Sequence, residues 1–237
     1  MNAHARLETG RHGLFFVSAT LIRTSDPAPM NTRPRLFVVV LTLTLTAPAL
    51  AASFVDLTVT GRVTPDACNV ELSDNGSVDH GRIPAHTLSS DEFTVLPAQL
   101  LELTVRCNRP MLFALVGIDN RADSSLAPDY FYGLGRNIHA PQERLGSVAL
   151  SLRNPMGDAQ TMQVLASYDS GETWATEPNA YPRSYMGFAL PGDRQPDFIR
   201  QLNVQLRVDT SINFSQYLTL DQEVPLDGSV VLDLRYL

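Results

Sequence analysis

Apolar side chains fall on every second position in several short segments of this chain, and this period of two constrains the fold more than any other feature. The alternating segments are VDLTVTGRV (55–63), LLELTVRC (100–107), SVALSL (147–152), LNVQLRV (202–208) and SVVLDLRYL (229–237). A period of two is that of a β-strand with one buried face. MLFALVGI (111–118) is apolar throughout, as expected of a strand buried on both faces.

Turn signals separate these segments, at DNG (74–76), NPMGD (154–158), DSG (169–171) and LPGD (190–193). No segment combines a sustained helical period with caps at both ends. Short strands punctuated by turns predict an all-β protein, an antiparallel β-sandwich. No repeat or composition change divides the later sequence, so we expect residues 52–237 to form a single domain.

The sequence from Met30 predicts export. It reads MNTRPRLFVVVLTLTLTAPALAA, with two arginines, an apolar run from Leu36 to Thr46 and the small-x-small site Ala49-Leu50-Ala51. We therefore expect residues 30–51 to be a signal peptide that is cut before Ala52. The run is shorter than the roughly 20 apolar residues of a spanning helix, so no membrane span is expected after cleavage. Export places the mature chain in the periplasm and then at the cell surface, or outside the cell.

Residues 1–29 precede this signal peptide. We interpret them as a mis-annotated leader, with translation beginning at Met30. A rival signal sequence, GLFFVSATLI at 13–22, follows basic residues but lacks a clean cleavage site, and it stays open as an alternative.

The charge of the chain disfavours nucleic acid as a partner. Its formal net charge is −7 and its eighteen basic residues are all arginine, whereas phosphate binding requires a basic surface. Five of the arginines lie before Ala52, so the mature part is the more acidic one.

The chain has two cysteines, Cys68 and Cys107. Since an exported protein meets an oxidising compartment, we expect them to form a disulfide, which would stabilise the fold by about 3–4 kcal/mol.

Catalytic and metal-binding patterns are hard to find. The histidines after Ala52 are His80, His86 and His139, and no two of them have the spacing of a zinc helix. IDNRADSS (118–125) loosely resembles a calcium loop, but Arg121 stands where a ligand oxygen is required, so a polar turn is the better interpretation. Neither a nucleophile elbow nor a phosphate-binding loop occurs. We expect no enzyme, no metal and no cofactor.

Several motifs carry a family resemblance. TPDACNVELSDNGSVDHGRI (64–83), IDNRADSS and YGLG (132–135) are similar to a bacterial fimbrial-operon family of the domain-of-unknown-function-1120 type. Gly61 before Cys68, LTVRC ending at Cys107, and the penultimate Tyr236 on an alternating strand resemble subunits of chaperone–usher pili.

The pilin resemblance implies an immunoglobulin-like sandwich that lacks its last strand, in which Cys68 and Cys107 join the first two strands. A groove beside the C-terminal strand would then be filled by a strand from a periplasmic chaperone and later from a neighbouring subunit, with an usher assembling the fibre for cell-surface adhesion. The groove residues would be Val230, Leu232, Leu234 and Tyr236. The donor-strand residues would be Val55, Leu57 and Val59.

Two departures from the pilin pattern leave alternatives open. The donor segment before Gly61 is short, and Val224 stands where pilins commonly have a glycine, so a tip, terminator or minor subunit is as plausible as a shaft subunit. The alternative class is a free-standing secreted β-sandwich, closed at its last strand, that binds a carbohydrate or surface ligand. Its candidate stacking residues are Tyr130, Phe131, Tyr132 and Trp174.

Overall fold

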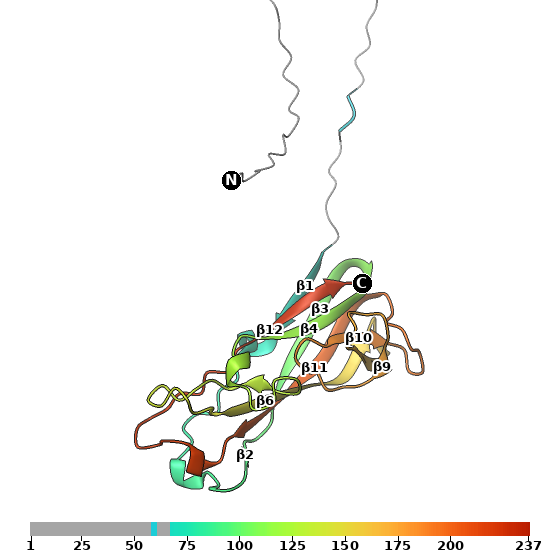
Figure 1. The fold of residues 1–237 in the computed structure, drawn as a ribbon. Helices are drawn as coiled ribbons and strands as arrows, with labels where there is room; N and C mark the ends of the chain where they lie inside the picture. Colours follow the sequence, from blue (N-terminus) through green and yellow to red (C-terminus); the bar gives the residue numbers. More distant parts are fainter. Residues whose placement is uncertain (1–57, 61–66) are drawn as a thin grey trace, which may run out of the picture. The chain divides into compact units, whose positions relative to one another are not determined.

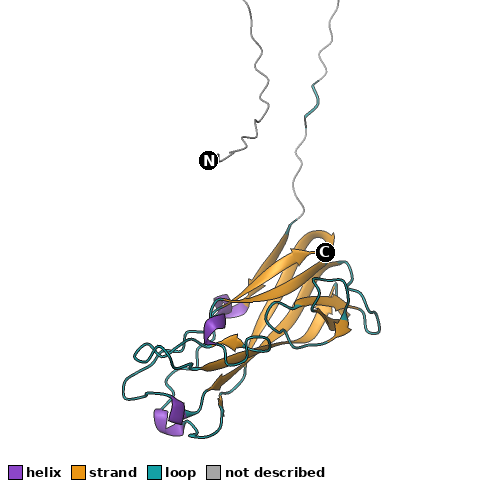
Figure 2. Cartoon of the chain, in the orientation of Figure 1, coloured by secondary structure: helices purple, strands orange, loops and turns teal. Residues whose placement is uncertain are grey.

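A computed structural model describes residues 58–60 and 67–237 of the chain, and the residues from Cys68 onward form one compact unit. Two antiparallel β-sheets make up this unit, joined by loops and four short 3₁₀ turns (Figures 1 and 2). The prediction of an all-β antiparallel sandwich is confirmed. The predicted leader (1–29) and signal peptide (30–51) lie outside the described residues.

The first sheet has the strand order β1-β3-β11-β6-β5, with β2 pairing to β11 and β7 to β6. Its strands are β1 (Cys68–Leu72), β2 (Thr94–Val95), β3 (Gln99–Met111), β5 (Tyr132–Gly133), β6 (Gly146–Gly157), β7 (Gln160–Thr161) and β11 (Ile199–Ile212). The long strands β3 and β11 pair along most of their lengths and form the centre of the sheet.

The second sheet has the strand order β12-β4-β10-β8-β9. Its strands are β4 (Phe113–Asp119), β8 (Gln163–Ser167), β9 (Ala175–Thr176), β10 (Tyr185–Ala189) and β12 (Val230–Tyr236). The 3₁₀ turns are η1 (Ser73–Gly76), η2 (Ala85–Thr87), η3 (Ala122–Ser124) and η4 (Ser215–Tyr217).

The hydrophobic core lies between the two sheets and follows the predicted alternation. On β3, Leu101, Leu103 and Val105 are buried while the residues between them are exposed or half-buried, and β11 repeats this pattern from Leu202 to Ile212. Phe113 to Gly117 on β4 are all buried, as the continuous apolar run predicts.

The turn predicted at residues 154–158 is wrong in its position. Strand β6 continues to Gly157, and its pairing with β11 shifts register between Arg153 and Met156. Asn154 has φ 50° at this irregularity, and the chain reverses afterwards at Asp158 and Ala159, which also have positive φ. Asn154 and Pro155 therefore lie in a β-bulge, which uses the same conformations as a turn, whereas Gly157 stays paired with Leu202.

Candidate functional site

The two sheets present unpaired edges on the same side of the sandwich. Within the described residues, β1 pairs with β3 alone and β12 pairs with β4 alone, and each is the first strand in its sheet's order. Figure 1 shows β1 and β12 lying close together. An edge strand has a row of backbone N–H and C=O groups to which another strand can pair.

The two edges touch at one end of the sandwich. The backbone N–H of Cys68, at the start of β1, donates a hydrogen bond to the hydroxyl of Tyr236, near the end of β12, over 2.9 Å. Tyr236 is itself half exposed. This hydrogen bond therefore closes the gap between the sheets at the end where the chain leaves β12.

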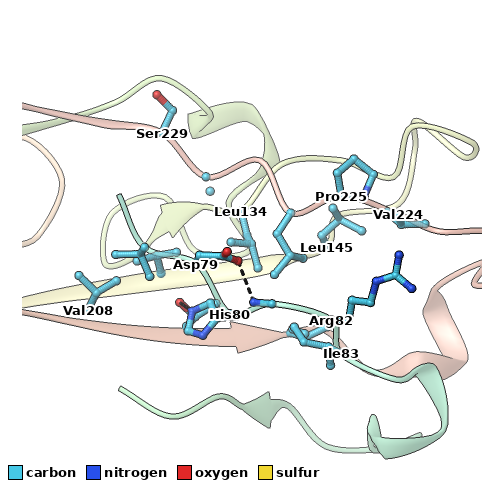
Figure 3. Close-up of a pocket in the computed structure, with 18 of the residues that line it drawn as sticks. Asp79, His80, Arg82, Ile83, Leu134, Leu145, Val208, Val224, Pro225 and Ser229 are labelled. Carbon is cyan, nitrogen blue, oxygen red and sulfur yellow. Dashed lines mark hydrogen bonds between the residues drawn. The ribbon is translucent and has the colours of Figure 1, made fainter. Parts of the chain in front are cut away.

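At the other end the edges enclose a hollow of about 700 Å³, which we name the strand groove. Its floor is the inner face of the first sheet, including Leu101, Leu206 and Val208, and one wall is formed by Val230 and Leu232 of β12. Leu72, the last residue of β1, lies on the opposite wall. Apolar side chains of Leu134, Leu145 and Val208 are visible in Figure 3.

Two chain segments border the strand groove. One runs from β1 to η2, and its His80 ring lies 3.0 Å from the Thr210 hydroxyl of β11. Asp79 accepts a hydrogen bond from the backbone N–H of Gly81 over 2.7 Å (Figure 3). The other segment, 218–229, leads into β12. Polar contacts thus hold the rim, while the interior is largely apolar.

The structure brings two of the four predicted groove residues to this hollow. Val230 and Leu232 line it, whereas Leu234 is half-buried against the core and Tyr236 forms the closed end. Of the predicted donor-strand residues, Val55 and Leu57 lie outside the described residues. Val59 is 87% exposed and belongs to no strand.

The predicted disulfide between Cys68 and Cys107 is confirmed. The two residues face each other in the antiparallel register of β1 and β3, so the bond joins the first strand to the second. The disulfide therefore holds one wall of the strand groove to the central part of the sheet.

The IDNRADSS and YGLG motifs form an anchor for the beginning of β12, a role that the sequence did not indicate. The Asp119 carboxylate accepts hydrogen bonds from the backbone N–H groups of Arg121 and Gly133, each over 2.8 Å. Arg121 in turn pairs with Asp227, over 2.7 Å, and Asn120 N–H donates to the carbonyl of Ser229. The polar turn predicted at 118–125 is present, and it also binds the segment that leads into β12.

Two of the four candidate stacking aromatics are structural. Tyr132 is fully buried, its hydroxyl donates to the carbonyl of Ala180 over 2.9 Å, and burial, aided by the Asp119 charge, raises its pKa. Trp174 is half-buried beside Gly187 of β10, and its ring N–H donates to the Gly171 carbonyl. Tyr130 and Phe131, in contrast, are exposed.

Among the residues that the structure describes, no group of three or more His, Cys, Asp or Glu side chains is arranged to hold a metal ion. In the same part of the chain, no helix has the length and apolar character needed to cross a membrane.

Comparison with known proteins gives one family and two relatives. The family described as "Protein of unknown function (DUF1120)" matches residues 57–146. Protein GltF of Escherichia coli (strain K12) is 24% identical over 241 residues, covering 81% of this chain and 91% of that protein. Uncharacterized protein YhcF of the same organism is 24% identical over 226 residues, covering 80% and 93%. Residues 57–146 are therefore similar to this family of unknown function, which is the resemblance that the sequence motifs predicted.

Proposed function

We propose that this protein is an exported, pilus-subunit-like component that accepts a β-strand from another chain in the strand groove. The observation that carries the proposal is that β1 and β12, the edge strands of opposite sheets, border one apolar hollow. An incoming strand can pair with the outer edge of β12 and insert alternate side chains between the sheets. A periplasmic chaperone and then a neighbouring subunit, assembled through an usher, are the proposed strand donors.

The closed end of the groove suggests a step in strand capture. A strand that runs along the whole of β12 must pass the hydrogen bond between Cys68 N–H and the Tyr236 hydroxyl. Strand addition therefore begins beside Val230 and Leu232, where the hollow is open, and advances toward Tyr236. In this proposal the chain acts as a structural component of a surface fibre that serves adhesion.

The test is to supply a strand within one molecule. A flexible linker and a copy of Val55–Val63 are added after Leu237, and the melting temperature is compared with that of the parent. Burial of the three alternating apolar side chains is expected to raise the melting temperature by on the order of 10 °C. Leu232→Asp should remove most of this gain because it places an unpaired carboxylate in the groove.

Val231→Asp is the matched control, since Val231 is the neighbouring residue on β12 and is 48% exposed. It should leave the gain intact. A parent that is already stable and does not respond to the added strand would instead favour the free-standing, closed sandwich. Stabilisation by an apolar small molecule, without any response to the strand, would make the hollow a ligand pocket.

A further inference from the structure

A second hollow lies on the other margin of the sandwich, where the outer edge of β6 is left uncovered for one residue. On one side β5 pairs with β6 as far as Val148. On the other side, the loop between β9 and β10 pairs with β6 from Leu150 onward. There the backbone N–H of Ala180 donates a hydrogen bond to the Leu150 carbonyl over 2.9 Å. Ala149 lies between the two pairings.

Aromatic side chains surround this gap. The hollow has a volume of about 220 Å³, and we name it the aromatic hollow; its lining residues are Tyr130, Phe131, Ala149, Leu150, Asn179 and Tyr181. The rings of Tyr130 and Tyr181 meet edge to face with centroids 5.7 Å apart, and Tyr168 extends the group with its ring 6.3 Å from that of Tyr181.

Two of these three tyrosine rings are exposed to solvent, and the ring of Tyr181 is half-buried. Tyr130 is 60% exposed and Tyr168 is 65% exposed. Large aromatic side chains gathered at the surface are typical of binding sites, because they present a broad apolar face at a small cost in conformational entropy.

Polar groups at the aromatic hollow are left without protein partners. Within the described residues, neither the side-chain amide of Asn179 nor the hydroxyls of Tyr130, Tyr168 and Tyr181 form a hydrogen bond. The Glu177 carboxylate accepts a hydrogen bond from the backbone N–H of Asn179 over 2.8 Å, and burial followed by the charge of Glu177 raises the pKa of Tyr168. The site therefore combines apolar faces with free donors and acceptors.

The backbone beside the aromatic hollow is held in an unusual conformation. Arg183 has φ 67°, a left-handed conformation that is unfavourable for a non-glycine residue. Its N–H donates to the Gly117 carbonyl over 2.8 Å, and the Ser184 hydroxyl donates to the Tyr181 carbonyl over 2.7 Å. Such a backbone conformation persists only where the surrounding structure fixes the loop. We take it as a sign that the loop carrying Tyr181 is held in one conformation.

We infer that the aromatic hollow binds a neutral sugar ring. A pyranose has an apolar C–H face that packs on an aromatic ring and a rim of hydroxyls that require donors and acceptors, and both are present here. The volume is below that of pockets for drug-sized ligands, which suits a single ring. Asp129 pairs with Arg183 over 3.5 Å and the negative charge of Glu177 acts on Tyr168, so an anionic sugar or a phosphate is disfavoured.

The position of the aromatic hollow makes this inference independent of the strand groove. It lies at β5 and β6, the last strands in the order of the first sheet, whereas β1 and β12 are the first strands of their sheets. A strand paired to β12 leaves the sugar site open. The inference therefore stands or falls separately from the proposed function.

The test uses protein purified from the periplasm of cells that express the full chain. The probe is an array of oligosaccharides that end in glucose, galactose, mannose or N-acetylhexosamine, with sialylated and sulfated glycans beside them. At least one neutral glycan should bind, and Tyr168→Ala and Tyr181→Ala should each weaken that binding by about tenfold. Tyr168 is so exposed that its replacement leaves the fold intact, which keeps the test decisive if the Tyr181 variant is unstable.

Tyr217→Ala is the matched control, because Tyr217 is also 60% exposed but stacks on Phe214 away from the aromatic hollow. The glycan affinity of the Tyr217→Ala variant should stay within about twofold of that of the parent. The inference is overturned if no neutral glycan binds, if the Tyr168 and Tyr181 variants bind like the parent, or if anionic glycans are preferred.

Discussion

The buried side chain of Tyr132 connects the first sheet to a loop of the second sheet. Its ring is fully buried and its hydroxyl donates to the Ala180 carbonyl, so it ties β5 to the loop that carries Asn179 and Tyr181. A Cβ atom on Gly117 of β4 would collide with this hydroxyl, so glycine is required there. The sequence shows three consecutive aromatic residues, Tyr130, Phe131 and Tyr132, and only the packing distinguishes the buried ring of Tyr132 from the exposed Tyr130.

Tyr132→Phe is expected to lower the free energy of unfolding by about 1 kcal/mol, because the Ala180 carbonyl loses its donor inside the protein. Urea denaturation measures the change. Tyr130→Phe is the control, since its exposed hydroxyl has no partner within the described residues, and it should leave stability unchanged. Equal effects of the two substitutions would show that the buried hydrogen bond contributes nothing.

Asp169 is expected to titrate at an unusually low pH. Hydrogen bonds from the side chain and backbone of Thr173, followed by one from Ser167, lower its pKa to about 2 from 3.8. Since the folded-state pKa is depressed, the stabilisation is present above pH 3.8 and is lost as the pH falls through 2. NMR titration of the carboxyl carbon tests this prediction.

Thr173→Ala should raise the pKa of Asp169 toward 3.8, because it removes the hydrogen bond with the largest effect. Thr176→Ala, which removes a hydroxyl bonded to Gln163 in the neighbouring strand, should leave that pKa unchanged. An ordinary pKa in the parent would mean that the loop does not hold these hydrogen bonds in solution.

At the scale of elements, the sequence predicted the strands that are long and half-buried. Alternation marks β3, β11 and β12 because each has one face on the core. It also marks β6 in sequence, although Ser147 and Ser151 on the other face of that strand are buried. The two-residue strands, such as β5 and β9, have no period to detect. β8 and β10 are buried at four of their five positions, so their sequences do not alternate and were not predicted as strands.

The anchor at the beginning of β12 gives a prediction at this scale. Asp119→Asn is expected to destabilise the protein by about 1.5–3 kcal/mol, since one carboxylate accepts two backbone hydrogen bonds and an amide can accept only at its oxygen. Hydrogen exchange should speed up at Arg121, at Gly133 and at Asn120, whose N–H donates to the Ser229 carbonyl.

Asp123→Asn is the control for this prediction. Asp123 forms an exposed pair with Arg136, and such a pair contributes about 0–1 kcal/mol. If exchange at Asn120 rose equally in both variants, the Asp119 carboxylate would not be what fixes the start of β12.

At the scale of the whole molecule, the sandwich and the disulfide could be predicted, but only part of the candidate site. Alternation places Val230, Leu232 and Leu234 on one face, and it cannot show that β12 ends against β1 while leaving a hollow at its start. That arrangement depends on pairings between residues more than 100 positions apart, such as Leu232 with Gly117 and Cys68 with Tyr236. The same limit applies to the aromatic hollow, which joins residues 130, 149 and 181.

The disulfide gives the last prediction, because it acts on the whole chain. It closes a loop with a sequence separation of 39 residues, so the double variant Cys68→Ala/Cys107→Ala should lose about 3–4 kcal/mol and melt on the order of 10 °C lower. The loss of stability should differ between strands and be largest at β1, since within the described residues β1 pairs with β3 alone. Hydrogen exchange should therefore increase more at Val70 and Leu72 than at Val204 of the central strand β11. Loosening β1 also moves one wall of the strand groove, so a strand added after Leu237 should stabilise this variant less than the parent. A uniform rise in exchange, with the full gain from the added strand retained, would show that pairing with β3 holds β1 in place without the disulfide.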